Sequence, residues 1–197
     1  MEYNRRTKTL VFIYNVLNLT REENYYDTIP LTFIVRQNQI VTISNEQNEY
    51  IIDQIREELE ENMHWSVFNF LLHSLFTISE NYFPILETLN KEQQKISKLL
   101  RKKTTKDNLF RLSDMEIEGM YLVSATKQNA VVLEQLKTQQ AFKELDDSER
   151  EQLEDNIIEA NQLVEMTDLH LQILHQIANT YNNVLNNNLN DTMKFLT

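Results

Sequence analysis

The chain has 197 residues, with one glycine, two prolines and no cysteine. So few glycines exclude an enzyme built on glycine-rich phosphate loops and favour long helices joined by few turns, and the lack of cysteine excludes disulfides, thiolate metal sites and cysteine nucleophiles. The formal net charge of −11 argues against nucleic acid as a partner, because binding phosphates requires clustered Lys and Arg.

The first third of the chain has the patterns of β-strands. Residues 10–19 (LVFIYNVLNL) are apolar, and residues 28–35 alternate between the two faces of a strand. A polar break at 37–38 separates residues 31–36 from 39–44, which predicts an antiparallel hairpin. Three strands are few for a stable sheet, so we expect helices to cover it or further strands to be missing.

From Asn45 onward the apolar period changes from two to about 3.6 residues, which predicts helices. We expect a helix over 49–62 and a second from 64 to 103, with a kink or break near Pro84. The basic segment 101–106 (RKKTTK) predicts a helix reversal, followed by a third helix over 108–142.

The last helix begins at Asp146–Ser148, whose side chains supply N-cap oxygens. No Gly or Pro follows before Thr197, so the helix can extend about 75 Å at ~1.5 Å per residue. It carries a heptad seam, which predicts lengthwise packing against other helices. The seam consists of Leu153, Ile157, Ala160, Val164, Thr167, Leu171, Leu174, Ala178, Tyr181, Leu185, Asn188, Thr192 and Phe195. A second apolar stripe suits a bundle or an oligomer and consists of Leu163, Met166, Leu169, Ile173, Ile177 and Val184.

These patterns predict an α+β fold that is predominantly α-helical. A small, partial β-sheet covered by helices is followed by long antiparallel helices, including a stalk helix of about 50 residues. We expect an α/β subdomain over 1–62, two long helices over 63–145 and the stalk helix over 146–197. No signal peptide and no stretch of ~20 apolar residues is visible.

The ending TYNNVLNNNLNDTMKFLT resembles the end of the cytosolic stalk in CorA-type magnesium and cobalt channels. That family typically has a tyrosine, an Asn- or Ser-rich stretch, and Asn-x-x-Met-Lys-x-Leu-Thr before its first membrane helix. The hairpin LTFIVRQNQIVTIS and the segment YFPILE agree with the family in order, so the resemblance extends from about residue 10 to 197. The matching residues of the ending are Tyr181, Asn190, Met193, Lys194, Leu196 and Thr197.

The resemblance implies that the chain starts partway through the family's N-terminal α/β domain and stops before both membrane helices and the Gly-Met-Asn selectivity loop. The full-length protein would be a homopentamer in the cell (inner) membrane, with this portion in the cytoplasm. The implied cation is Mg²⁺, with Co²⁺, Ni²⁺ and Zn²⁺ as further candidates. By itself the fragment is expected to be a monomer or a lower oligomer.

Four residues of the last helix are candidates for lining the pore. Asn190, Met193 and Leu196 are three residues apart and fall on one helix face, and Asn179 lies three turns before Asn190. The resemblance implies that they form collars at the cytosolic entrance, where amide oxygens hold a hydrated cation and apolar side chains constrict the path. The alternative is that they are ordinary polar seam positions or end residues.

Asp155 is the candidate metal ligand. The resemblance places it where family members carry a stalk aspartate that joins a magnesium site between subunits, with a partner carboxylate from the neighbouring subunit. Mg²⁺ favours carboxylate and water oxygens. The alternative is that Asp155 belongs to a solvated acidic face with Glu151, Glu154 and Glu159.

The sequence shows no catalytic grouping, so we expect no enzyme. The leading hypothesis is the cytosolic regulatory and gating domain of a CorA-like channel, in which cations bound between subunits favour the closed state. One alternative is the cytosolic domain of a ZntB-like zinc transporter. An alternative of another class is a soluble helical scaffold without a transport role.

Overall fold

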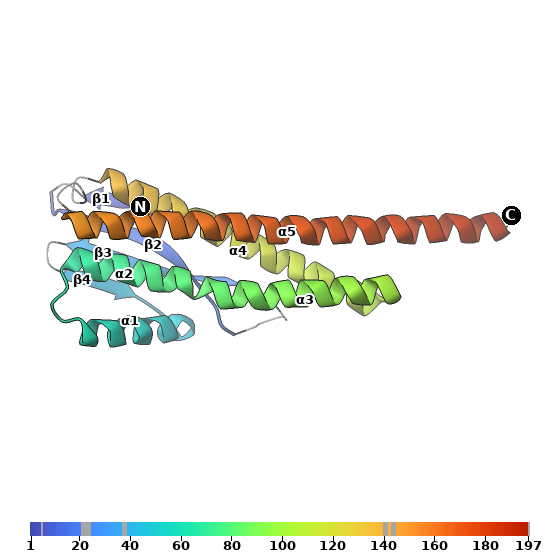
Figure 1. Ribbon diagram of the computed structural model, residues 1–197, viewed down its shortest axis with the longest axis horizontal. Coiled ribbons are helices and arrows are strands. Elements are labelled where there is room, and N and C mark those ends of the chain that lie inside the picture. The colour runs from blue at the N-terminus through green and yellow to red at the C-terminus, as the bar shows by residue number, and fades with distance from the viewer. Residues whose placement is uncertain (5, 21–24, 37–38, 140–141, 143–144, 197) are drawn as a thin grey trace.

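The computed structural model describes residues 1–4, 6–20, 25–36, 39–139, 142 and 145–196, and the side chains of the last helix as far as residue 186. The molecule is elongated (Figure 1). The sheet and the N-terminus lie at one end, and the last helix runs along the whole molecule and projects beyond the others at the opposite end. Within the described residues, no helix combines the length and apolarity required to cross a membrane.

The sheet of the described chain has four antiparallel strands that neighbour one another in chain order. The predicted hairpin is confirmed, since Arg36 lies opposite Gln39 at its closed end. The first strand was not predicted, because three residues are too few to show an alternating pattern. The strands are β1 (Glu2–Asn4), β2 (Thr9–Leu17), β3 (Thr28–Arg36) and β4 (Gln39–Ile43).

One face of the sheet is buried. Alternate residues of β2 and β3 point to this face, where the Phe12 and Phe33 rings stack with centroids 5.3 Å apart. The hydroxyl oxygens of Tyr14 and Ser79 lie 3.2 Å apart, which joins the sheet to the helix α2 (Val67–Glu80). Asn129 of the helix α4 (Lys106–Thr138) accepts from the Asn15 backbone N–H at 2.7 Å and donates to the Asn15 carbonyl at 2.8 Å. Its amide thus pairs with β2 as a neighbouring strand would.

The helices follow the sheet in the chain. After a short 3₁₀ turn at Glu46–Asn48, they are α1 (Glu49–Glu61), α2 (Val67–Glu80), α3 (Tyr82–Lys102), α4 (Lys106–Thr138) and α5 (Asp147–Leu196). Between α2 and α3 the chain breaks at Asn81, three residues before Pro84. Pro84 therefore lies in the first turn of α3, where a missing backbone N–H is tolerated.

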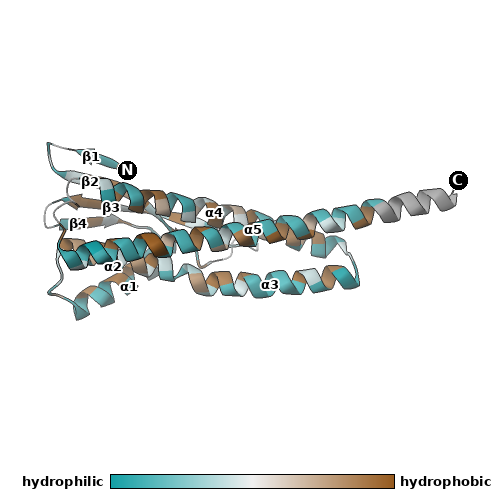
Figure 2. Ribbon diagram, turned by 45° about the horizontal axis from the view of Figure 1, so that its top comes forward, coloured by the Kyte–Doolittle hydropathy of each residue, from teal (hydrophilic) through white to brown (hydrophobic). Residues whose placement is uncertain are grey.

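The heptad seam of α5 is packed throughout its described length. Every seam residue from Leu153 to Leu185 is buried or half-buried, and Leu153, Ala160, Leu174 and Tyr181 are among the buried ones. Brown and teal segments accordingly mix along this helix in Figure 2. The fold class is confirmed as a small antiparallel sheet followed by long helices. The predicted division into three parts at residues 62 and 145 stays a prediction. Buried residues from all three parts belong to one hydrophobic cluster, so the core does not separate them.

Candidate functional site

The start of α5 is fixed by a reciprocal cap. Asp146 Oδ1 accepts from the Glu149 backbone N–H at 2.8 Å, and Glu149 Oε2 accepts from the Asp146 N–H at 3.1 Å. The Ser66 hydroxyl donates to Glu149 Oε1 and also caps α2 by accepting from the Asn69 N–H at 3.0 Å. The first turns of α2 and α5 are therefore held together, which sets the two helices side by side.

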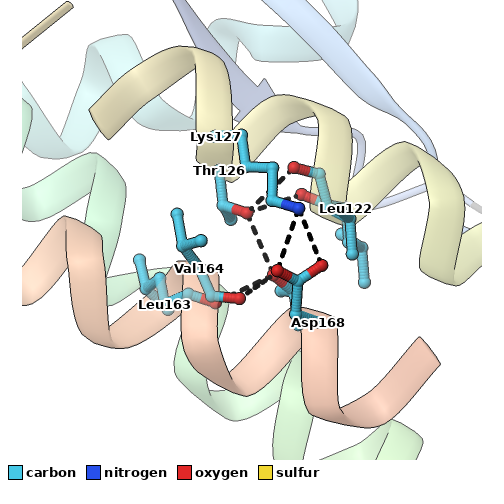
Figure 3. Close-up of polar contacts among 8 residues, drawn as sticks. Leu122, Thr126, Lys127, Leu163, Val164 and Asp168 are labelled. Carbon is cyan, nitrogen blue, oxygen red and sulfur yellow. Dashed lines mark hydrogen bonds and ion pairs between the residues drawn. The ribbon is translucent and has the colours of Figure 1, made fainter. Parts of the chain in front are cut away.

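The contact between α4 and α5 includes a buried polar pair and a surface ion pair (Figure 3). The hydroxyls of Thr126 and Thr167 lie 3.0 Å apart in the interior. One residue further along each helix, Lys127 Nζ lies 2.9 Å from the Asp168 carboxylate. These contacts define the register between the two helices, so that α4 fixes how α5 is rotated.

The contact between α3 and α5 lies further along. Gln93 donates to the His170 carbonyl at 3.2 Å, and the Tyr181 hydroxyl donates to the Ser97 carbonyl at 3.3 Å. His170 Nδ1 lies 3.2 Å from Asn90 Oδ1, whereas its buried Nε2 has no partner among the described residues. Burial lowers the pKa of His170, so the ring is held in its neutral form.

Three carboxylates form a row on α5 that we call the acidic ridge: Glu151, Asp155 and Glu159. Residues four apart on a helix lie on one face, so the three point the same way. Glu151 and Asp155 line a hollow of about 470 Å³ together with His64 and His73. Side chains of α2, of the segment before it and of α5 thus surround this hollow, and the His73 ring stacks on the Trp65 ring with centroids 4.2 Å apart.

Glu159 continues the ridge toward α2. Partial burial, and secondly the carboxylate of Glu80 on α2, raise the pKa of Glu159. The two carboxylates therefore repel each other across the contact between the helices. A cation placed between them would remove this repulsion.

Within the described residues, no group of three or more His, Asp or Glu side chains is arranged to hold a metal ion. In one copy the acidic ridge therefore supplies at most part of a metal site. Further ligands would have to be water molecules or side chains of another copy.

The structure places the predicted site residues unevenly. Asp155 is exposed on the acidic ridge, and Asn179 is exposed further along α5. Asn190, Met193 and Leu196 fall within the bounds of α5, but their side chains lie outside the described residues. His73 lines the same hollow as Asp155, and Glu80 faces Glu159. Sequence reasoning did not connect either residue with the acidic ridge, because both approach it only through the packing of α2 on α5.

The second apolar stripe of α5 is only partly covered. Leu163 is buried, whereas Leu169, Ile173 and Val184 are 58%, 37% and 42% exposed. Asp155, Met166, Ile173 and Val184 are separated by 11, 7 and 11 residues, which are close to whole numbers of turns. The acidic ridge and the uncovered stripe therefore lie on one face of α5, opposite the packed seam.

Comparison of the sequence with known protein families identifies the family of this chain. The family model described as CorA-like Mg²⁺ transporter protein matches residues 1–197. Among curated proteins, no sequence gives a significant match.

Solved structures share the fold. The complete CorA magnesium transporter from Methanocaldococcus jannaschii is 21% identical with a TM-score of 0.80, over 95% of this chain and 59% of that one. The soluble domain of the same protein is 20% identical with a TM-score of 0.74, over 86% and 68%. The ZntB cytoplasmic domain from Vibrio parahaemolyticus is 11% identical with a TM-score of 0.73, over 94% and 72%. The chain thus spans less than two thirds of the complete transporter.

Proposed function

Since this chain belongs to the family of CorA-like Mg²⁺ transporter proteins, we propose that it is the cytosolic regulatory and gating part of a divalent-cation channel. The observation that carries the proposal is the single face of α5 on which the acidic ridge is followed by an uncovered apolar stripe. Such a face combines a surface for assembly with carboxylates for cations. The full-length protein would lie in the cell membrane, with this portion in the cytoplasm.

Self-association is supported by the uncovered stripe. Leu169, Ile173 and Val184 expose apolar surface on a helix that projects beyond its own bundle (Figure 1). Apolar surface of this kind is stabilised by burial against another helix. In the proposed homopentamer, the α5 helices of five copies surround a common axis.

Cation regulation is supported by the acidic ridge. Glu151, Asp155 and Glu159 repeat in every copy, and the described residues of one copy form no group of three ligands arranged to hold a metal ion. We assign Asp155 as the ligand of a regulatory site between subunits, with Mg²⁺ as the cation. Bound Mg²⁺ neutralises facing carboxylates and favours the closed ring, and loss of the ion leaves repulsion that loosens it.

The residues that we assign to the pore lie further along α5, toward its C-terminal end. Asn179 and Asn190 would offer amide oxygens to a hydrated cation, and Met193 and Leu196 would form narrower apolar collars. Zinc is the alternative cargo, but the structural similarity to the ZntB domain is lower than that to the CorA transporter. Co²⁺ and Ni²⁺ remain further candidate ions.

Transport measurements on the full-length protein test the proposal. We expect Mg²⁺ flux into vesicles to be high when the side carrying this domain has little Mg²⁺, and to fall when Mg²⁺ is raised there. Asp155→Asn should weaken this inhibition, whereas Asp53→Asn on exposed α1 serves as the matched control. Equal flux at low and high Mg²⁺ would refute cation gating, and a reading frame that ends at residue 197 would favour a scaffold.

A further inference from the structure

The reversal between α3 and α4 carries a concentration of positive charge that the proposed function leaves unexplained. Residues 93–106 contain no acidic residue, although the chain has a net charge of −11. Six of its 19 Lys and Arg residues are found there. We call these residues the basic tip: Lys95, Lys98, Arg101, Lys102, Lys103 and Lys106.

The basic tip is exposed. All six side chains are exposed, and none takes part in an ion pair found among the described residues. A helix C-terminus gains from one or two cations in its last turn, which accounts for Arg101 and Lys102. The other four basic residues are more than the helix end requires.

Two large apolar side chains accompany the basic tip. Leu99 is 41% exposed and Phe110 is 58% exposed. Lys106 Nζ lies 5.3 Å from the centre of the Phe110 ring. Exposed aromatic and aliphatic side chains next to Lys and Arg are typical of surfaces that contact the headgroup region of a membrane.

The reversal between α3 and α4, which carries the basic tip, lies on the side of the molecule toward which α5 projects (Figures 1 and 2). The bond from the Tyr181 hydroxyl to the Ser97 carbonyl sets the two helices at one level. From there, α5 continues 15 residues to Leu196, or about 22 Å, and α3 continues six residues to Lys103, or about 9 Å. The tip therefore ends roughly 13 Å short of the end of α5. A lysine side chain and a Debye length of about 8 Å span much of that gap.

We propose that the basic tip binds the anionic phospholipid headgroups of the membrane into which α5 leads. The inference rests on the proposed function, because that function puts a membrane at the end of α5. Charge complementarity selects this partner: residues 93–106 carry six positive charges and no negative one, and headgroups of phosphatidylglycerol are negative. The contact would hold the α3–α4 hairpin against the membrane while α5 moves.

Vesicle sedimentation with residues 1–197 tests the inference. At 0.15 M NaCl, the chain should bind vesicles of phosphatidylglycerol and phosphatidylcholine, but not vesicles of phosphatidylcholine alone. Each basic residue near an anionic surface strengthens binding about fivefold. The triple variant Lys98→Gln, Lys102→Gln, Lys103→Gln should therefore bind on the order of 100-fold more weakly.

The matched control removes the same charge at the opposite end of the molecule: Lys8→Gln, Arg36→Gln, Lys137→Gln. It should bind vesicles as the unmodified chain does, and circular dichroism would verify that both variants are folded. The inference would be overturned if the tip variant bound anionic vesicles as tightly as the unmodified chain does, or if the control variant lost as much binding as the tip variant. Failure of the unmodified chain to bind anionic vesicles would also overturn it. Displacement from vesicles by millimolar inorganic phosphate would also overturn it, since the ligand would then be a soluble anion. Cation-gated flux without lipid binding would defeat this inference and leave the proposed function standing.

Discussion

Thr126 Oγ1 of α4 and Thr167 Oγ1 of α5 lie 3.0 Å apart in the buried contact between the two longest helices. Each hydroxyl also lies within hydrogen-bonding distance of a carbonyl in its own helix, Thr126 with Leu122 at 3.0 Å and Thr167 with Leu163 at 2.9 Å. Each hydroxyl has one hydrogen, so the bond between the helices requires one threonine to donate across and the other to donate to its own helix.

Replacing this pair should reveal its coupling. Thr126→Val or Thr167→Val alone keeps the branched shape and should lower the free energy of unfolding by about 1 kcal/mol. The double variant should cost less than the sum of the two, by roughly 0.5 kcal/mol or more, because the second change removes a hydroxyl that has already lost its partner. Urea unfolding of the four proteins measures the cycle, and simple additivity would show that the two hydroxyls do not interact.

Gly119 tests how closely α4 and α5 approach. A Cβ built on Gly119 would lie 3.1 Å from Leu171 Cδ1, the far end of a flexible side chain. Gly119→Ala should be nearly neutral, because a gain of about 1 kcal/mol in helix propensity offsets the tighter contact. Gly119→Val should destabilise by about 1–3 kcal/mol through overpacking. Thermal unfolding of both variants checks this, and a valine variant as stable as the alanine one would contradict the close approach.

Local patterns were sufficient to predict much of this fold. The alternation in residues 31–44 predicted the β3–β4 hairpin, and the heptad spacing from Leu153 to Leu185 predicted which face of α5 is packed. Both are properties of side chains that are close together in the sequence. The short strand β1 gave no such signal, since its pairing with β2 depends on a turn and on partners outside its own three residues.

The candidate site was less accessible to sequence reasoning. The spacing of Glu151, Asp155 and Glu159 was visible and placed three carboxylates on one face. The position of His73 and Glu80 beside them was not, because it depends on how α2 packs against α5 about 80 residues later. The shared cap of Ser66 and Glu149 is a contact of the same long-range kind.

His170 should make stability depend on pH. Burial lowers its pKa below the ordinary value of about 6.5. Between the two values the unfolded chain binds a proton that the folded chain does not, so stability is present above pH 6.5 and falls as the pH drops toward the lowered pKa. In the His170→Gln variant, the melting temperature should therefore change less between pH 7 and pH 5 than it does in the unmodified protein. The exposed His175→Gln is the control, and an unchanged slope in the His170 variant would contradict the assignment.

Glu159 should act in the opposite sense. Its pKa is raised, so its contribution to stability is present at low pH and is lost as the pH rises through the raised value. Glu159→Gln should therefore raise the melting temperature slightly at pH 7, within the ~0.5 kcal/mol range of surface changes. The gain should disappear near pH 4, where the wild-type carboxyl is protonated. Asp147→Asn, at the exposed start of α5, should show no such gain, and a variant less stable at pH 7 would contradict repulsion from Glu80.

Removal of Mg²⁺ should act on the assembly of copies rather than on the fold of one copy. The described residues of one copy form no group of three ligands that could hold a metal ion, so the proposed function requires another copy to supply ligands for tight binding. We expect sedimentation velocity to show larger species of residues 1–197 with millimolar Mg²⁺ than with EDTA, while the circular dichroism spectrum stays the same. Asp155→Asn should remove this difference, and Asp53→Asn should keep it. If the size of the assembly were independent of Mg²⁺ in the unmodified chain and in both variants, the acidic ridge would be only a solvated surface.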